Sequence, residues 1–319
     1  MLPPPAGLVT LTPSPAIDRT YRLPRLLLGE VNRATSVTEE FAGKGVNVSR
    51  NLSLTGIRAP AVVPLSSRDR SAVEGDELVV PSECSGRLRV NITAIDDNGE
   101  TTKLNESAPS LSAEEWNTLV STAKDVVEKS DSSWLLVAGS FPPIAGGVPD
   151  VHDFRSRLPL GASVALDTSG EVFEVWARSG AIDFVKPNVK ELGEVLGRSL
   201  DTLGDVADAA VEVASWGVSY VMVSMGADGF LGHSGGEFWW ATCEPVDVRN
   251  TIGAGDASVS GFFDSLLRNP DDVRSAVGRA AQWGAQKVQQ VTSQLNHLEG
   301  LPTVTVTDFL ERSRPVTAD

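Results

Sequence analysis

The stretch Asn250-Thr-Ile-Gly-Ala-Gly-Asp-Ala-Ser258 decides how the rest of this chain is interpreted. Its glycines at positions 253 and 255 permit a tight turn with positive φ and bare backbone N–H groups. A helix-like run, Ala257 to Leu267, follows directly. Because the amides and the dipole of a helix N-terminus attract negative charge, we predict that an anion binds at this turn.

A carboxylate, Asp256, stands beside this predicted anion site. It adds negative charge where an anion is expected, so its presence there needs a chemical reason. Asp256 could take a proton from a hydroxyl group that attacks a phosphoryl group held by the turn. The alternative is an ordinary glycine-rich turn in which the aspartate caps the helix N-terminus.

The composition limits the possible partners. The 319 residues carry a net charge of −15, which argues against nucleic acid or an anionic membrane as the main partner. Two cysteines and three scattered histidines give neither a disulfide framework nor a zinc-ligand pattern. No basic segment precedes an apolar core at the start, Met1 to Pro5, and no apolar run is long enough to span a bilayer. We therefore expect a cytoplasmic protein.

Short apolar runs alternate with helical patterns along most of the chain. Such alternation predicts an α/β fold with a mainly parallel central sheet and helices on both faces. The predicted strands are 8–11, 134–138, 163–166, 182–185 and 220–224, and the predicted helices include 46–55, 112–128, 201–214 and one rich in small residues from 276 to 288.

One segment departs from this alternation. Residues 87–94 alternate strictly between apolar and polar side chains, Asp97-Asn-Gly99 offers a hairpin turn, and residues 101–105 fit the returning strand. Its polar face could meet a ligand, as in a lid, or simply water, as in an edge hairpin. We predict a single domain, 1–319, with a small β lid formed by segments around 17–40 and 87–106.

Several polar residues follow directly after predicted strands, at the sheet edge where open α/β sheets bind ligands. Asp18 could be a turn residue or a ligand contact, and Lys44, in a Gly-Lys-Gly turn, a solvated lysine or an anion contact. Asn188 and Glu191 could orient hydrated Mg²⁺ or cap a helix. Ser224 and the turn at 253–256 belong to the same edge, so we predict one shared site.

These stretches, in this order, resemble the ribokinase-like (PfkB) sugar kinase family along nearly the whole chain. The most diagnostic is Thr251-Ile-Gly-Ala-Gly-Asp256. The other matching motifs are Thr12-Pro-Ser-Pro-Ala-Ile-Asp18, Gly29-Glu-Val-Asn-Arg33, Ala42-Gly-Lys-Gly-Val-Asn47, Arg89-Val-Asn91, Lys186-Pro-Asn-Val-Lys-Glu-Leu192 and Ser224-Met-Gly-Ala-Asp-Gly229. Within the family, the likeness is greatest to kinases of phosphorylated ketohexoses.

The resemblance implies a role for each matching position. Asp256 would be the catalytic base, and the amides of Gly253, Ala254 and Gly255 would form the anion hole. The implied sugar-phosphate contacts are Asp18, Gly43, Lys44, Asn47, Arg89 and Asn91, with Arg89 and Lys44 on the phosphate. The implied ATP contacts are Lys186, Asn188, Ser224, Gly226, Ala227, Gly229 and Gly255, and Glu191 would act on Mg²⁺, largely through water. Pairing of lids between subunits would give a homodimer.

The acceptor sugar is less well defined. The resemblance favours an ATP-dependent kinase that converts fructose 1-phosphate to fructose 1,6-bisphosphate, through the segment Gly29 to Arg33. Tagatose 6-phosphate and fructose 6-phosphate have similar outlines and remain alternatives. Two departures bear on this choice: the segment 65–87 is short and lacks the usual glycines, and Gly139-Ser-Phe-Pro-Pro143 lacks a following glycine.

Two other classes of protein are alternatives. A catalytically silent sugar-phosphate sensor on the same fold would need no base, which Asp256 argues against. A dinucleotide-binding oxidoreductase would need a GxGxxG turn, and Ser258 breaks that pattern.

Overall fold

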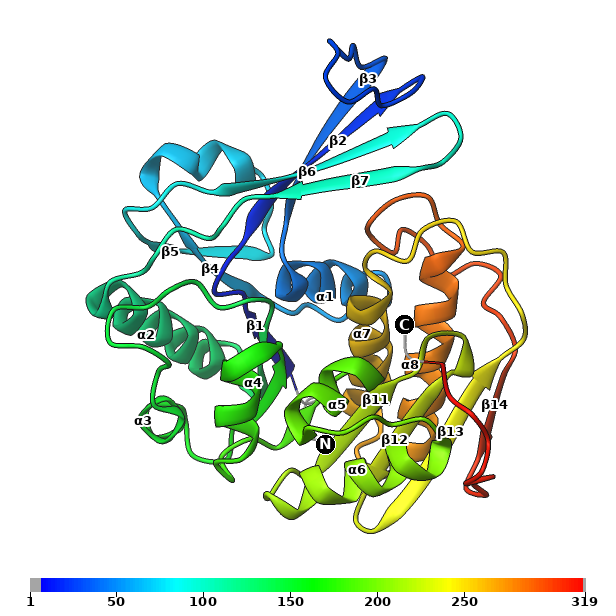
Figure 1. The fold of residues 1–319 in the computed structure, drawn as a ribbon. Coiled ribbons are helices and arrows are strands. Elements are labelled where there is room, and N and C mark those ends of the chain that lie inside the picture. The colour runs from blue at the N-terminus through cyan, green and yellow to red at the C-terminus, as the bar shows by residue number, and fades with distance from the viewer. Residues whose placement is uncertain (1–6, 318–319) are drawn as a thin grey trace.

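A computed structural model describes residues 7–317 of the chain. The predicted domain range 1–319, and with it the N-terminal stretch Met1 to Pro5, therefore extends outside the described residues. The described part contains a ten-stranded sheet and a separate four-stranded sheet, which rises above the main body in Figure 1. No helix within 7–317 is both long and apolar enough to cross a membrane.

The ten-stranded sheet confirms the predicted mainly parallel architecture. Its strand order is β14-β13-β12-β11-β10-β9-β8-β1-β4-β5, and every neighbouring pair from β11 to β5 is parallel, whereas the pairs from β11 to β14 are antiparallel. The strands are β1 Gly7–Leu11, β4 Ala61–Leu65, β5 Val79–Glu83, β8 Ser132–Ala138, β9 Ser163–Asp167, β10 Phe184–Val185, β11 Tyr220–Ser224, β12 Phe230–Ser234, β13 Glu237–Cys243 and β14 Val304–Thr307.

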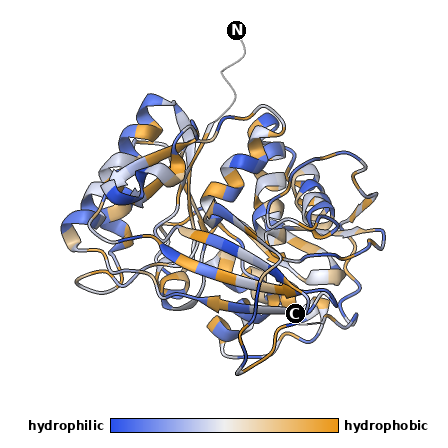
Figure 2. Ribbon diagram, turned by 90° about the horizontal axis from the view of Figure 1, so that it is seen from above, coloured by the Kyte–Doolittle hydropathy of each residue, from blue (hydrophilic) through white to orange (hydrophobic). Residues whose placement is uncertain are grey.

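Helices cover both faces of this sheet. One face packs against α1, α7 and α8, and the other against α2, α5 and α6 (Figure 1). The helices are α1 Lys44–Ser53, α2 Ala113–Lys129, α3 Val151–Ser156, α4 Gly170–Ala177, α5 Val189–Leu196, α6 Leu203–Ser215, α7 Ala254–Arg268 and α8 Val273–Val288. Along the buried strand β1, Leu8 belongs to one core cluster and Val9 and Leu11 to the other, as the two-residue strand period requires. Figure 2 shows hydrophobic and hydrophilic residues interspersed along the elements.

The four-stranded sheet has the order β3-β2-β6-β7 and consists of β2 Ala16–Leu23, β3 Ser36–Ala42, β6 Arg89–Asp96 and β7 Thr101–Asn105. The predicted hairpin is confirmed: β6 and β7 are antiparallel and joined by a turn in which Gly99 has a φ of 83°. The Asp96 carboxylate accepts hydrogen bonds from the backbone N–H groups of Asn98 and Glu100, which fixes this turn. Strand β7 is exposed along its length, whereas β6 is half-buried.

The short segment 65–87 folds into a compact connection. Residues Ser67–Val73 form a 3₁₀ helix, η1, that leads to the edge strand β5. The Asp69 carboxylate accepts hydrogen bonds from the Ser66 hydroxyl and from the backbone N–H of Leu88. A glycine-poor sequence can form this connection because two side-chain hydrogen bonds hold its ends.

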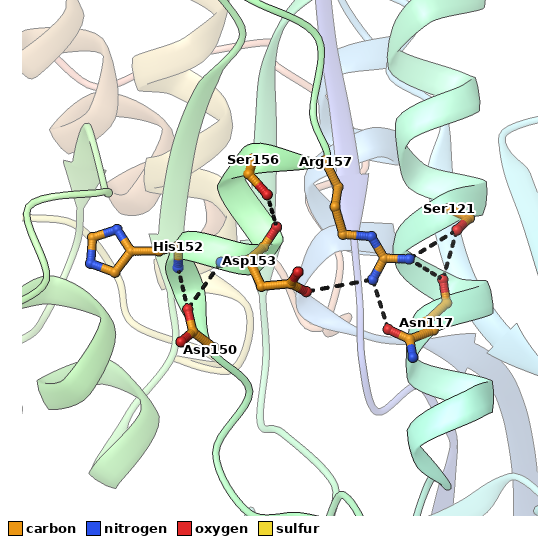
Figure 3. A network of polar contacts seen from close by, with 7 residues as sticks. All are labelled: Asn117, Ser121, Asp150, His152, Asp153, Ser156 and Arg157. Atoms are coloured by element: carbon orange, nitrogen blue, oxygen red, sulfur yellow. Dashed lines mark hydrogen bonds and ion pairs between the residues drawn. The ribbon is translucent and has the colours of Figure 1, made fainter.

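The short helix α3 depends on side-chain contacts for its position. Asp150 caps its N-terminus by accepting hydrogen bonds from the backbone N–H groups of His152 and Asp153 (Figure 3). The Arg157 guanidinium then donates to the Asn117 side chain at 2.7 Å and to the Ser121 hydroxyl at 3.2 Å, both on α2. This network joins two scaffold helices.

Helices α7 and α8 pack closely because small residues line their contact. A Cβ atom at Gly261 would overlap the Arg279 carbonyl oxygen and would lie 3.0 Å from the Trp283 ring.

We expect Gly261→Ala to lower the free energy of unfolding by about 1–3 kcal/mol, because the backbone of α8 must move. Urea unfolding measures this change. Thr118→Ala, on the exposed face of α2, is the control and should stay within about 0.5 kcal/mol; equal values for both variants would contradict the packing argument.

Strand β1 marks the point where the order of the parallel strands reverses. The chain proceeds from β1 to β4 and β5 on one side, and β8, β9, β10 and β11 follow on the other side. Open α/β sheets bind ligands outside the carboxyl ends of the strands at such a switch point. The loops after β1, β8 and β9 therefore define where a site is expected.

Candidate active site

The turn that opens α7 has the predicted left-handed glycine. Gly253 is the N-cap residue, with a φ of 83°, and its missing side chain leaves room for the Ser293 carbonyl group. The Ala254 amide donates to the Thr251 carbonyl oxygen at 3.2 Å. Among residues 7–317, the amides of Gly253 and Gly255 have no recorded acceptor and stay available to an anion.

The capping alternative for Asp256 is wrong. Asp256 lies in the first turn of α7, and no side chain caps this helix. Asp256 is 7% exposed, and its carboxylate accepts a hydrogen bond from the Asn47 amide at 2.7 Å. Burial raises the pKa of Asp256 to about 6; Lys44, Asn47 and Lys186 oppose this shift, whereas Asp167 adds to it. The carboxylate is thus ionised at neutral pH but more basic than an exposed one.

Helices α1 and α7 run alongside each other and are joined by polar contacts at regular intervals. The three hydrogen bonds are Asn47 to Asp256 at 2.7 Å, Asn51 to Ser260 at 3.1 Å and Thr55 to Asp264 at 2.5 Å. Each step is four residues on both sides, so the two chain segments run in the same direction. Both helix N-termini consequently point to the same place, and both attract negative charge there.

A buried carboxylate that the sequence analysis did not select, Asp167, organises the cations of the site. Asp167 ends β9 and is 1% exposed, and its Oδ1 atom lies 3.1 Å from Lys44 Nζ and 3.7 Å from Lys186 Nζ. Burial acts to raise the pKa of Asp167, but Lys186 and Lys44 outweigh it and hold the pKa below its usual value. In the sequence, Asp167 directly follows the predicted strand 163–166, and this position could have marked it as a site residue.

Lys44 is surrounded by acidic groups. Burial acts to lower the pKa of Lys44, but Asp167, Asp256 and Glu191 outweigh it, and the pKa lies above its usual value. Gly43 places this lysine at the start of α1, because a Cβ there would lie 2.6 Å from the Thr12 methyl group. Lys44 is therefore a fixed cation beside the Asp256 carboxylate.

Arg89 lies at the predicted sugar end of the site. Its guanidinium donates to the Ser14 carbonyl oxygen and to the Ser140 hydroxyl, each at 3.2 Å. These partners follow β1 and β8, so Arg89 extends from the four-stranded sheet to the switch point. Burial lowers the pKa of Arg89 from its usual value, while Asp18 opposes this effect. Ser14 and Ser140 were not among the predicted site residues.

Asp18 and Asn91 lie side by side on neighbouring strands. The Asn91 amide donates to the Asp18 carboxylate at 2.9 Å, and the two residues are register partners in the parallel pair β2–β6. Burial raises the pKa of Asp18, although Asn91, Arg89 and Lys103 oppose the shift. The predicted sugar contacts on the lid thus form one connected polar group.

Several buried polar atoms around these residues have no hydrogen-bond partner within the described part of the chain. They include Ser14 Oγ, Asn47 Oδ1, Arg89 Nε, Asn91 Oδ1, Asp167 Oδ2 and Thr168 Oγ1. Native proteins satisfy most buried polar groups, so such a concentration calls for an explanation. These atoms gather near the switch point, where open α/β sheets bind ligands.

Asn188 and Glu191 form a capping box at the start of α5. The Asn188 side chain accepts from the Glu191 N–H at 2.7 Å, and Glu191 Oε2 accepts from the Asn188 N–H at 2.9 Å. The capping alternative of the sequence analysis is therefore observed. Glu191 Oε1 has no recorded partner among residues 7–317, so one carboxylate oxygen remains available to hydrated Mg²⁺, for which one or two carboxylates suffice.

The remaining predicted ATP contacts lie next to α5. Ser224 pairs with Asn188 in a parallel β-bridge, and Gly226–Asp228 forms a short 3₁₀ turn, η2, that contains Ala227. Gly229 has a φ of 95°, and a Cβ there would overlap the Ala241 carbonyl oxygen. Lys186 connects this region to the turn, because its Nζ lies 3.6 Å from where a Cβ of Gly255 would stand. The roles of all these residues in binding stay predictions.

Comparison with known proteins shows a phosphotransferase that acts on an alcohol group, and the kinase family implies ATP as co-substrate. The model of the pfkB family carbohydrate kinases matches residues 154–299. The 1-phosphofructokinase of Haloferax volcanii is 34% identical over 86% of this chain and 90% of that protein, and the 1-phosphofructokinase of Escherichia coli is 30% identical over 81% and 83%. This chain belongs to the PfkB family and is an ATP-dependent sugar phosphate kinase.

A solved structure has the same architecture. The structure of phosphofructokinase-2 from Escherichia coli in complex with potassium has a TM-score of 0.82 and 26% identity, and the match covers 92% of this chain and 96% of that one. The predicted ribokinase-like fold is thereby confirmed. Pairing of two lids stays a prediction. The exposed apolar side chains of Val37 and Leu104 on the four-stranded sheet, and of Leu28 and Val31 in the loop between β2 and β3, are available for it.

Proposed function

We propose that this kinase transfers the γ-phosphoryl group of ATP to the O6 hydroxyl group of fructose 1-phosphate, which yields fructose 1,6-bisphosphate and ADP. The observation that carries the proposal is the combination of a buried carboxylate, Asp256, which lies beside the cation Lys44, with the Arg89 guanidinium at the lid end of the site. The relatives named 1-phosphofructokinase support the choice of acceptor.

In this proposal Asp256 removes the proton of the O6 hydroxyl while oxygen attacks the γ-phosphorus. The Oδ2 atom of Asp256 accepts a hydrogen bond from Asn47, whereas its Oδ1 atom has no hydrogen-bond partner among residues 7–317. Oδ1 is therefore the atom that accepts the proton. The new O6–P bond forms as the bond between the γ-phosphorus and the ADP oxygen breaks. A base with a pKa near 6 is ionised at pH 7 and still basic enough to share the proton in the transition state.

Charge on the transferred group is stabilised by the N-terminus of α7. The amides of Gly253 and Gly255 have no backbone acceptor among residues 7–317 and belong to a helix N-terminus whose dipole also favours negative charge. Lys186, next to Gly255, adds a cation on the ATP side. Mg²⁺, when bound, neutralises charge on the ATP phosphates, and Glu191 Oε1 would hold it through water.

The phosphate already on the sugar would bind at the lid. Arg89 offers a planar guanidinium at the lid end of the site, and this geometry suits contact with phosphate. Asp18 and Asn91 would then hold sugar hydroxyl groups, because they form a fixed donor and acceptor pair beside Arg89.

A second candidate acceptor is fructose 6-phosphate, phosphorylated at O1. The likeness to phosphofructokinase-2 favours it, since that enzyme has also been solved in complex with fructose-6-phosphate. We expect kcat/KM to be highest for fructose 1-phosphate in a panel with fructose 6-phosphate, tagatose 6-phosphate and unphosphorylated fructose. A preference for either 6-phosphate would overturn the proposed acceptor but not the chemistry.

Loss of the Arg89 guanidinium should weaken binding of the phosphosugar specifically. We expect Arg89→Ala to raise KM for fructose 1-phosphate by about 10–100-fold, because a charge-assisted contact with phosphate is lost, and to leave KM for ATP nearly unchanged. Arg87→Ala is the matched control, since Arg87 is exposed and paired with Glu106. An unchanged KM for the phosphosugar in Arg89→Ala would place the phosphate elsewhere.

A further inference from the structure

A fully buried lysine lies behind the catalytic turn. Lys287, in the last turn of α8, is 0% exposed, and its Nζ donates to the Asn250 carbonyl oxygen at 3.1 Å. No carboxylate within residues 7–317 lies at ion-pair distance from this ammonium group. A buried cation without an acidic partner is costly, and methionine would fill the same space without that cost.

The residue that accepts from Lys287 connects two loops. Asn250 donates through its side chain to the Val291 carbonyl at 2.9 Å, and its side-chain oxygen accepts from the Ile252 N–H at 3.0 Å. Its own N–H donates to the Val288 carbonyl at 3.1 Å. Asn250 therefore fixes the segment that enters the turn to the end of α8, and Lys287 contributes the only charged group among these contacts.

The lysine side chain also packs directly against the turn. A Cβ at Gly253 would lie 3.4 Å from Lys287 Cε, so the lysine stem forms the wall behind the left-handed residue that opens α7. The free amides of Gly253 and Gly255 are on this same turn. A shift of the Asn250 carbonyl would consequently move the amides that are proposed to face the phosphoryl group.

We propose that Lys287 is a positioning residue for phosphoryl transfer: its ammonium group holds the Asn250 carbonyl and the 251–253 turn in place and supplies fixed positive charge behind the anion-binding amides. The inference rests on the proposed kinase function of that turn. The charge acts through the turn and not by contact with substrate.

Electrostatics around the site agree with this role. Burial lowers the pKa of Lys287 to about 8, and the Asp256 charge opposes the shift. The group is therefore still mainly protonated at pH 7. Its positive charge is retained close to the place where negative charge develops during transfer.

The test compares Lys287→Met with the wild-type enzyme and with Lys129→Met, which removes an exposed lysine from the last turn of α2. We expect Lys287→Met to fold with an equal or higher Tm and to lose at least about tenfold in kcat, a smaller loss than for a donor in direct contact. KM for both substrates should change by less than about threefold, because the lysine touches neither. Lys129→Met should match the wild type.

Chemical rescue separates charge from packing. In Lys287→Ala, ammonium or methylammonium chloride should restore part of kcat, whereas tetramethylammonium or sodium chloride at the same ionic strength should not. A folded Lys287→Met enzyme with wild-type kcat would overturn the proposal, and so would failure of both variants to fold, since the ammonium would then serve folding alone. Absence of activity in the wild type would instead refute the proposed acceptor.

Discussion

Asp256→Asn is expected to lower kcat by roughly 10²–10⁴-fold, because the attacking hydroxyl loses its base while the shape of the site is kept. Steady-state assays of ADP release measure this loss. The variant retains a side chain that can contact Asn47, so its KM values should change little. Turnover close to that of the wild type would show that Asp256 is not the base.

The same substitution should stabilise the fold at neutral pH. Because burial raises the pKa of Asp256 to about 6 in the folded chain, against 3.8 ordinarily, the folded state holds its proton more tightly than the unfolded state does. The contribution of protonated Asp256 to the free energy of unfolding is fully present below about pH 4 and is lost as the pH rises through about 6. At pH 7.5 we expect Asp256→Asn to raise the free energy of unfolding by about 1–3 kcal/mol.

Asp264→Asn is a matched control for both results. Asp264 is also buried on the same helix, but it pairs with Arg268 at 3.2 Å and with Arg279 at 3.0 Å. Removing its charge should therefore destabilise the protein, opposite in sign to the effect of Asp256→Asn.

For the wild-type enzyme, kcat/KM should fall on the acid side with an apparent pKa near 6, the value of Asp256 in the free enzyme.

Asp167→Asn is expected to have the second largest effect. Lys44 and Lys186 lose the carboxylate that neutralises them, so we expect a loss of stability of about 3 kcal/mol. Removing the negative charge also lowers the pKa of Asp256, because Asp167 acts to raise it. The acid limb of the kcat/KM profile should therefore move to lower pH, a shift that a purely structural residue would not produce.

Asp183→Asn is the control for this shift. Asp183 precedes β10 and pairs with Arg155 at 2.5 Å, so its loss should reduce stability without moving the acid limb. The pH profile of purified protein, with urea unfolding in parallel, separates the two effects. An acid limb that stays in place in Asp167→Asn would mean that Asp167 and Asp256 are not electrostatically coupled.

Local patterns were sufficient to predict most of the fold. Strand β11 and strand β7 were predicted to the residue, because alternation and turn signals are properties of neighbouring residues. The predicted helix 112–128 matches α2, whose N-terminus is closed by a capping box between Ser112 and Glu115. The short pairing of β10, two residues long, could not be bounded from sequence because its ends depend on β9 and β11.

The site was only partly predictable, since its contacts join distant segments. Asp167 has a role because Lys44, 123 positions away, meets it in space, and no local pattern encodes that meeting. Lys287 stands among small residues that indicate helix packing, and only the fold shows that its ammonium group is buried behind the turn. Glycine spacing did predict the turn itself, because a positive φ is a local requirement.

The evenly spaced hydrogen bonds that α1 and the residue Thr55, just beyond its end, make with α7 turn sliding of one helix along the other into a stepwise event. An α-helix rises about 1.5 Å per residue and about 5.4 Å per turn, so the next register that could re-pair these polar groups lies a full turn away. Any smaller slip would break the hydrogen bonds from Asn47 to Asp256 and from Asn51 to Ser260 together. The separation between Asn47 and Asp256 is thus set in discrete increments, and the catalytic alignment resists gradual drift.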